Sequence, residues 1–236
     1  MNLNETFNRF GSDKGNSVGA SHNYAPIYEK WFDSRKDDKV TFMEVGIDYG
    51  QSAGAWHDYF SNGQIFMVDY KDFSSYNKDR LQCLTANQSS FSDMLGIANK
   101  VDEIDFFIDD GGHCMNHQQH TFGALFPKMK KGGLFFIEDT HTSNWDPSTQ
   151  PEGSPGFCYG QPVMINADRS NTTINVFKQF QKTGSFKSEF LPTSLYTLLT
   201  GIIDEVVIYD DLNNEVPVDQ PTNNIIKHGV ILIKRK

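Results

Sequence analysis

Seven short runs rich in Val, Ile, Phe and Met recur along this 236-residue chain, and they constrain its fold more than any other feature. The runs are nearly continuous in apolar residues, which is typical of parallel strands that helices cover on both faces. They are VTFMEVG (40–46), QIFMVDY (64–70), LQCLTAN (81–87), IDFFIDD (104–110), GLFFIED (133–139), EVVIYDD (205–211) and GVILIKR (229–235).

Helix-like segments separate most of these runs. They are YAPIYEKWF (24–32), SAGAWHDYF (52–60), SSFSDMLGIA (89–98), HCMNHQQHTFGALFPKM (113–129) and TTINVFKQFQKT (172–183). Alternating strands and helices of this length predict an α/β fold, a doubly wound Rossmann-like sheet with right-handed crossovers. The last two strands are joined by a polar segment without a clear helix. We therefore expect seven strands, mostly parallel, with one antiparallel strand near the C-terminus.

The chain divides into an N-terminal helical segment over residues 1–39, which we expect to act as a lid, and a Rossmann-like domain over 40–236. One long irregular segment, 140–171, directly follows the fifth predicted strand. A loop of this length in a compact domain is usually functional. We interpret it as a substrate-side loop above the carboxyl edge of the sheet, with a surface insertion as the alternative.

Charge and composition exclude several classes of partner. The net charge of −9 would repel a phosphate backbone, so we expect no nucleic-acid partner. No apolar stretch approaches the roughly 18 residues of a membrane span, and the N-terminus lacks the pattern of a secretion signal. Three cysteines without a CxxC motif argue for a reducing compartment. We therefore expect a cytoplasmic protein that does not bind a membrane.

Polar side chains gather where the first five predicted strands end. Ligands of open α/β sheets bind beyond the carboxyl ends of the strands, so these side chains would share one edge. They are Glu44, Asp69, Asn87, Asp109, Asp110, Glu138 and Asp139. A single acid at a strand end is ordinary, but acids at four of five successive ends favour a functional site.

The turn after the first strand, EVGIDYG, resembles a nucleotide-binding turn without its full set of glycines. Gly46 and Gly50 allow a sharp turn and a close approach of backbone to ligand, whereas Asp48 stands where a pyrophosphate-binding loop has its second glycine. Asp69, at the end of the second strand, could accept hydrogen bonds from both ribose hydroxyls. The pattern favours a nucleoside cofactor without a pyrophosphate, of which S-adenosylmethionine is the common one.

Asp110 ends the fourth predicted strand, and Glu138 and Asp139 end the fifth. If these strands are neighbours, they lie about 4.8 Å apart and the three carboxylates converge. Like charges at that distance repel, and a hard divalent cation such as Mg²⁺, Mn²⁺ or Ca²⁺ resolves the conflict. The alternative is that Glu138 or Asp139 only caps the next loop.

Three histidines follow this acid pair. His113 lies beyond the flexible Gly111 and Gly112, beside the expected metal, and could act as a general base. His117 and His120 share its helical face, so a three-histidine zinc or iron site is conceivable. That spacing covers two helical turns, or about 10 Å, which is too far for one ion. We expect His117 to be structural and His120 to be solvated.

The array IDDGGH, His117 and LFPKMKKGGLFFIEDTHTSNW resembles the metal-dependent sugar O-methyltransferases that modify macrolides, and a wider cephalosporin-hydroxylase-like group. FGSDKG, HNY and FMEVGIDYGQSAGAWHDYF fit the opening of the same family, so the likeness covers about residues 7–145. It implies a class I methyltransferase that uses S-adenosylmethionine and Mg²⁺ (or Mn²⁺) to methylate a hydroxyl of a sugar or glycan. Family members often form dimers or tetramers, which is compatible with a homo-oligomer.

The resemblance also implies roles for individual residues. Asp110, Glu138 and Asp139 would bind magnesium, and His113 would be the general base. The cofactor would lie against Glu44, Gly46, Asp69, Asn87, Gln88 and Asp109, with Gln88 near the adenine. Tyr24, His141 and Trp145 would lie on the acceptor side, while Lys14 and His22 match the closing segment without an assigned role. Asn87 departs from the family, which usually has an acid there, and 146–200 offers no match.

Three other readings stay open at this point. A catechol-type O-methyltransferase would use the same metal-assisted chemistry on a vicinal diol. A non-haem iron oxygenase would use two histidines and one carboxylate, for which His113, His117 and Asp110 are candidates. A nucleoside-binding module without catalysis would need no intact base, and the presence of His113 disfavours it.

Overall fold

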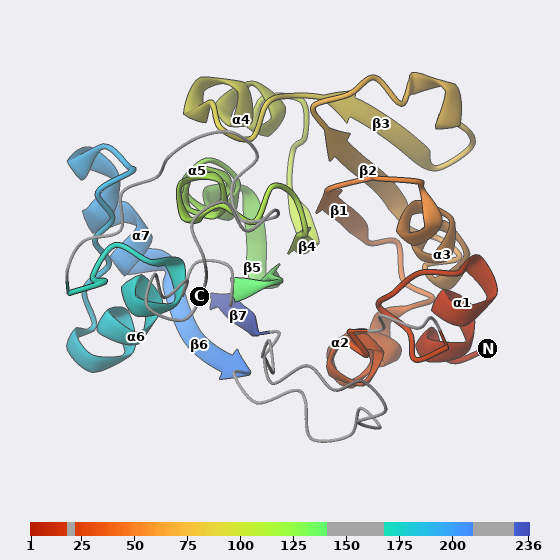
Figure 1. The fold of residues 1–236 in the computed structure, drawn as a ribbon, viewed down its shortest axis with the longest axis horizontal. Helices are drawn as coiled ribbons and strands as arrows, with labels where there is room; N and C mark the ends of the chain where they lie inside the picture. The colour runs from red at the N-terminus through yellow and green to blue at the C-terminus, as the bar shows by residue number, and fades with distance from the viewer. Residues whose placement is uncertain (18–21, 141–167, 210–228) are drawn as a thin grey trace, which may run out of the picture.

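A seven-stranded sheet forms the centre of the computed structural model, which describes residues 1–17, 22–140, 168–209 and 229–236 (Figure 1). The strand order is β3-β2-β1-β4-β5-β7-β6. The strands are β1 (Thr41–Val45), β2 (Gln64–Asp69), β3 (Leu81–Thr85), β4 (Ile104–Asp109), β5 (Met129–Ile137), β6 (Ile203–Tyr209) and β7 (Val230–Arg235).

The pairing of these strands confirms the predicted fold class. Strands β1 to β5 pair in parallel, whereas β7 runs antiparallel to both of its neighbours, β5 and β6. One antiparallel strand near the C-terminus was expected. β4 and β5 are hydrogen-bonded neighbours, as the predicted convergence of their terminal acids requires.

Helices lie on both faces of the sheet (Figure 1). The α-helices are α1 (Leu3–Phe10), α2 (Ala25–Phe32), α3 (Gln51–Tyr59), α4 (Phe91–Ala98), α5 (Met115–Leu125), α6 (Thr173–Thr183) and α7 (Tyr196–Ile202). The 3-10 turns are η1 (Asp33–Arg35), η2 (Ser74–Tyr76), η3 (Phe126–Lys128) and η5 (Thr193–Leu195). No helix in the described ranges is both long and apolar enough to span a bilayer.

The helix termini follow from local sequence. Ser90 caps α4 by accepting a hydrogen bond from the Asp93 amide. α1 was not predicted as a separate helix, although Asn2 and Glu5 form a reciprocal capping box at its start. The short helix α7 was also not predicted.

Alternation along the strands divides the apolar side chains into two cores. Phe107 and Phe135 lie in the core beneath α4 to α7, whereas Phe106 and Phe136 lie in the core beneath α1 to α3. Successive strand residues point to opposite faces, so a residue's parity decides which helices it meets. The acids at the ends of β1, β4 and β5 are divided between the two faces by the same alternation.

The strand order reverses between β1 and β4, and doubly wound folds bind their ligands at such a point. Gly46 closes β1 at this point with a φ of +102°, and an added Cβ would meet the Asp110 carbonyl oxygen at 2.0 Å. Only glycine therefore lets the end of β1 approach the end of β4 so closely.

Strand β5 begins at Met129, four residues before the predicted start at Gly133. Met129 pairs with Ile104, and the register then shifts before Leu134 pairs with Phe106. The polar sequence KKGG between these pairs hid the extra pairing, because it breaks the apolar run from which the strand was predicted.

Replacing Phe32 with alanine tests the core beneath α1 to α3. The Phe32 ring is fully buried and contacts six other rings, those of Tyr28, Phe42, Trp56, Phe60, Phe106 and Phe136. We expect the free energy of unfolding in urea to fall by about 3–5 kcal/mol. Leu95→Ala, at an exposed site on α4, should change it by less than about 0.5 kcal/mol.

Candidate active site

Three carboxylates converge on the face of the sheet that α1 to α3 cover. Glu44 lies on β1, whereas Asp110 and Glu138 directly follow β4 and β5. The amide of Asp110 donates to the Val45 carbonyl and that of Glu138 to the Asp109 carbonyl, each at 2.9 Å, so the ladder continues past the strand ends. One oxygen of each of the three acids lies within 4.8 Å of the others.

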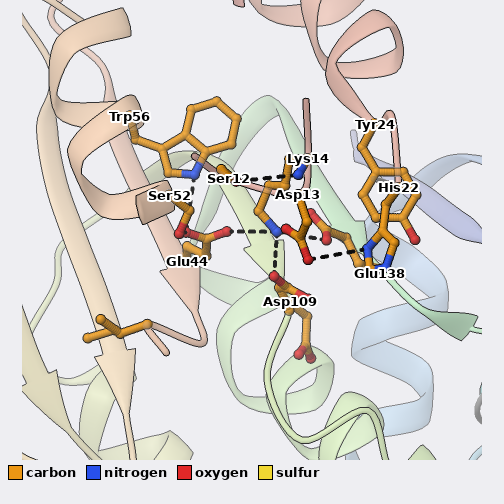
Figure 2. A network of polar contacts seen from close by, with 12 residues as sticks. Ser12, Asp13, Lys14, His22, Tyr24, Glu44, Ser52, Trp56, Asp109 and Glu138 are labelled. Atoms are coloured by element: carbon orange, nitrogen blue, oxygen red, sulfur yellow. Dashed lines mark hydrogen bonds and ion pairs between the residues drawn. The ribbon is translucent and has the colours of Figure 1, made fainter. Parts of the chain in front are cut away.

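The ammonium of Lys14 lies among these three carboxylates (Figure 2). Its Nζ forms ion pairs with Asp110 Oδ2, with Glu138 Oε2 at 2.8 Å and with Glu44 Oε1 at 3.4 Å. The Lys14 side chain is only 1% exposed, and those of Glu44 and Glu138 are fully buried. A buried ammonium is stable here because it faces several opposite charges at once.

The loop after α1 places Lys14. Gly11 ends α1 in the left-handed region with φ at 71°, and the Ser12 amide donates back to the Phe7 carbonyl. The Lys14 amide then donates to Ser12 Oγ at 3.3 Å, and its carbonyl accepts from the Ala25 amide at 3.0 Å. The segment between α1 and α2 is therefore fixed at both ends, with Lys14 directed at the sheet.

Burial and charge act in opposite directions on these groups. Burial by itself would lower the pKa of Lys14, but Asp110, Glu138 and Glu44 outweigh it and raise that pKa well above its usual value. Burial also raises the pKa of Glu138 well above its ordinary range and that of Glu44 to about 7, the latter against the effect of Lys14. These raised pKa values show that a single ammonium does not offset both the burial of Glu44 and Glu138 and their repulsion by Asp110.

Two tyrosines of α2 and its N-cap hold the acids at the end of β5. The Tyr28 hydroxyl donates to Glu138 Oε1, and the Tyr24 hydroxyl donates to Asp139 Oδ1 at 2.6 Å. Both tyrosines are fully buried, and burial beside the acids raises the pKa of each phenol well above 10. Tyr24 was predicted on the acceptor side, a role that stays a prediction.

Asp139 and His113 form a second polar pair beside the first cluster. Both have left-handed backbones, with φ at 51° and 55°, which non-glycine residues adopt at a cost. His113 Nε2 lies 3.6 Å from Asp139 Oδ2, and the imidazole is partly exposed. The strained turns direct both side chains toward Asp110. One oxygen of Asp110 lies within 4.8 Å of a ring nitrogen of His113 and of a carboxylate oxygen of Asp139.

Two groups of residues in the described part of the chain could hold a metal ion, and they share Asp110. One is Glu44, Asp110 and Glu138; the other is Asp110, His113 and Asp139. The predicted ligands Asp110, Glu138 and Asp139 are divided between the two groups. This carboxylate-rich set suits a hard divalent cation, so the residues present fit a magnesium site.

The predicted ribose contact, Asp69, ends β2 at the same edge of the sheet. Its Oδ2 accepts from the Ile47 amide at 3.0 Å and its Oδ1 from the Lys71 amide at 2.9 Å. These bonds fix the carboxylate beside the turn that Gly46 opens. Asn87, beyond β3, is exposed, and its Oδ1 accepts from the Ser89 amide. Glu44 is less accessible, because its Oε2 accepts from Ser52 Oγ and Trp56 Nε1 (Figure 2).

Gln88 and Asp109 face the opposite side of the sheet. Gln88 Nε2 donates to Asp109 Oδ1 at 2.6 Å and to Thr121 Oγ1 at 2.9 Å, and its Oε1 accepts from the Gly112 amide. Burial raises the pKa of Asp109 to about 6. This network holds the turn that leads to His113, and the predicted cofactor contacts of Gln88 and Asp109 stay predictions.

His117 and His120 do not join the metal groups. His117 is 8% exposed, and neither of its ring nitrogens makes a hydrogen bond to any part of the chain that the structure describes. His120, expected in solvent, is half-buried with its ring 5.9 Å from that of Phe91. A facial triad of His113, His117 and Asp110 is thus not formed, which removes the support for an iron oxygenase.

Sequence reasoning missed the roles of Lys14 and Tyr28. Lys14 belongs to the quoted motif FGSDKG and Tyr28 to the predicted helix YAPIYEKWF, but nothing in the spacing shows that they meet an acid more than a hundred residues away. His141 and Trp145 lie outside the described residues, as does most of the loop 140–171.

No protein-family model matches the chain. The relatives found by sequence are all named as O-methyltransferases. The chain is 35% identical over 144 residues to 8-demethyl-8-alpha-L-rhamnosyl tetracenomycin-C 2'-O-methyltransferase of Streptomyces olivaceus, covering 58% of this chain and 37% of that protein. It is 30% identical over 170 residues to mycinamicin VI 2''-O-methyltransferase of Micromonospora griseorubida, covering 69% of this chain and 42% of that protein. The chain spans less than half the length of these relatives.

A solved structure extends the likeness over the whole chain. MycE methyltransferase from the mycinamycin biosynthetic pathway, in complex with Mg, SAH and mycinamycin VI, superposes with a TM-score of 0.72 at 22% identity. The match covers 100% of this chain and 54% of that one. The chain has the class I methyltransferase fold. Its sequence relatives are sugar O-methyltransferases, in agreement with the resemblance found in its motifs.

The buried imidazole of His117 predicts a pH-dependent loss of stability in this methyltransferase fold. Burial lowers the pKa of His117 to about 4, whereas an unfolded histidine titrates at about 6.5. The unfolded chain therefore takes up this proton first, and stability present above about pH 6.5 is lost as the pH falls toward 4.

Between about pH 7.5 and 5, we expect the free energy of unfolding of His117→Gln, measured in urea, to fall by about 1–2 kcal/mol less than that of wild type. An NMR titration of the His117 ring gives an independent check. A midpoint near the ordinary histidine value would contradict the prediction.

Proposed function

We propose that this chain catalyses the S-adenosylmethionine-dependent, Mg²⁺-dependent O-methylation of a hydroxyl on a sugar or glycan. One observation carries the proposal: on a methyltransferase fold, acids from β4 and β5 and the imidazole of His113 meet at the carboxyl edge of the sheet. The relatives named as sugar O-methyltransferases support the reaction class. A catechol-type acceptor is the alternative, and none of the named relatives favours it.

The edge formed by β1 and β2 would hold the methyl donor. Gly46 leaves the backbone open at the turn, and Asp69 would accept hydrogen bonds from the ribose hydroxyls. Glu44 would support the donor site indirectly, because its buried carboxylate holds the side chains of Ser52, Trp56 and Lys14 in place. When bound, S-adenosylmethionine supplies an activated methyl group whose bond to sulfur breaks as the new bond to oxygen forms.

Asp110, Glu138 and Asp139 would hold the magnesium ion, with Tyr24 and Tyr28 fixing the orientation of the last two. A bound divalent ion lowers the pKa of a hydroxyl that it touches and orients it. The protein's contribution is to present these oxygens from adjacent strands. Asp110 is central to this task because it belongs to both candidate groups.

His113 would remove the proton from the acceptor hydroxyl as the oxygen attacks the methyl group. Its imidazole is partly exposed and so open to an acceptor, and Asp139 Oδ2 lies 3.6 Å from its Nε2. The carboxylate stabilises the imidazolium that forms. The thioether leaves neutral and needs no proton. His141 and Trp145, with Tyr24, are proposed to lie near the acceptor.

Replacing His113 with alanine tests the proposed base. We expect the turnover number to fall by about 10²–10⁴-fold, the usual effect of losing a general base. Binding of S-adenosylmethionine should be unchanged. His57→Ala on α3, away from the acid cluster, is the matched control and should retain activity. A His113 variant with normal turnover would contradict the assignment.

Calorimetry separates the cofactor site from the metal site. We expect S-adenosylmethionine to bind wild type and Asp110→Ala, and Asp69→Ala to weaken that binding by about 10–100-fold, since it loses charged hydrogen bonds. Asp110→Ala should instead weaken Mg²⁺ binding. Binding of 2-oxoglutarate only with Fe²⁺ would overturn the methyltransferase proposal. Testing glycan and nucleotide-sugar acceptors against catechols then identifies the substrate class.

A further inference from the structure

The Lys14 ammonium occupies a position with the features of a cation site. Its Nζ lies within 3.4 Å of an oxygen from each of Glu44, Asp110 and Glu138. One oxygen of each of these three acids lies within 4.8 Å of the others, close enough to bind a common ion. We propose that the acid cluster has two adjacent cation positions and that Lys14 permanently fills one, so that the chain binds one divalent ion instead of two.

The second position lies on the other side of Asp110. Asp110, His113 and Asp139 form a separate group, and Asp110 bridges the two. This inference rests on the proposed metal site and narrows it: because Glu138 faces the ammonium, the ion beside Lys14 would be held by Asp110 and Asp139. The arrangement resembles two-metal sites, in which shared carboxylates hold ions about 3.5–4 Å apart.

Glu44 supports a built cation position instead of an incidental ion pair. Its carboxylate is fully buried, and Ser52 and Trp56 direct one oxygen while leaving Oε1 aimed at Lys14. Glu44 Oε1 makes no hydrogen bond among the described residues, and the ammonium 3.4 Å away is its neutralising charge. Without Lys14, the buried Glu44 and Glu138 and the partly exposed Asp110 would share no cation.

A tethered ammonium differs from a metal ion in what it can do. It supplies one positive charge and three donors but offers no open coordination position to a substrate. Chelation of an acceptor is thereby confined to the position beside His113. Lys14 is in this sense a positioning residue that decides how many ions the cluster holds and where the acceptor can bind.

Counting bound Mn²⁺ tests the inference directly. We expect wild type to bind one ion per chain by calorimetry, and Lys14→Ala to bind two. The second ion should broaden the Mn²⁺ electron paramagnetic resonance spectrum through coupling between neighbouring spins. In the double variant with Lys14→Ala and Glu44→Gln, the vacated position lacks one of its acids, and we expect the count to return to one.

The outcomes separate this inference from the proposed function. Wild type that binds no Mn²⁺ would overturn the proposed metal site, and with it the inference. One ion in wild type and still one in Lys14→Ala would overturn the inference alone.

Lys14→Ala will be less stable without metal, because removing one partner of a buried ion pair is destabilising. Mn²⁺ should then restore its circular dichroism spectrum with two ions per folded chain. Failure to refold at saturating Mn²⁺ would also overturn the inference, because the metal would not have replaced the ammonium.

Discussion

The ion pairing of the buried Lys14 with the carboxylates of Glu44, Asp110 and Glu138 is the interaction on which the candidate site depends. Parallel strands bring Glu44, Asp110 and Glu138 to one edge and one face of the sheet, where their mutual repulsion would push the strand ends apart. The ammonium offsets that repulsion and attaches the N-terminal segment to the sheet. The same ion pairs thus support both the proposed catalytic site and the docking of α1 and α2 on the sheet.

Backbone conformation at three residues also brings the groups of the candidate site together. Gly46 brings β1 against the carbonyl of Asp110, while left-handed residues at 113 and 139 turn two side chains back toward the same point. Strained conformations of this kind persist where surrounding contacts determine them. Here those contacts include the Tyr24 hydroxyl on Asp139 and the Gln88 network beneath the turn.

The sequence was sufficient to predict the sheet and the edge at which the acids gather. Apolar runs located all seven strands, and the acids that end them fall where the structure brings Asp110 and Glu138 together, because side-chain alternation is a local property. The contacts of Lys14 could not be predicted, since its position depends on how a loop packs against strands far along the chain. The start of β5 was missed because its pairing runs through polar residues, and α1 was missed although its capping box is visible in the sequence.

The span of chain between Lys14 and its acids governs how the centre can assemble. Lys14 and Glu138 are 124 positions apart, and Tyr28 and Glu138 are 110 apart. Contacts between such distant segments form late, after the intervening loop closure has been overcome. During synthesis the first two helices leave the ribosome well before the fifth strand exists. The ring contacts of these helices with α3, such as Phe7–Trp56 and Phe32–Trp56, join nearer segments and can form first, so β5 brings Glu138 to a Lys14 whose helices are already docked.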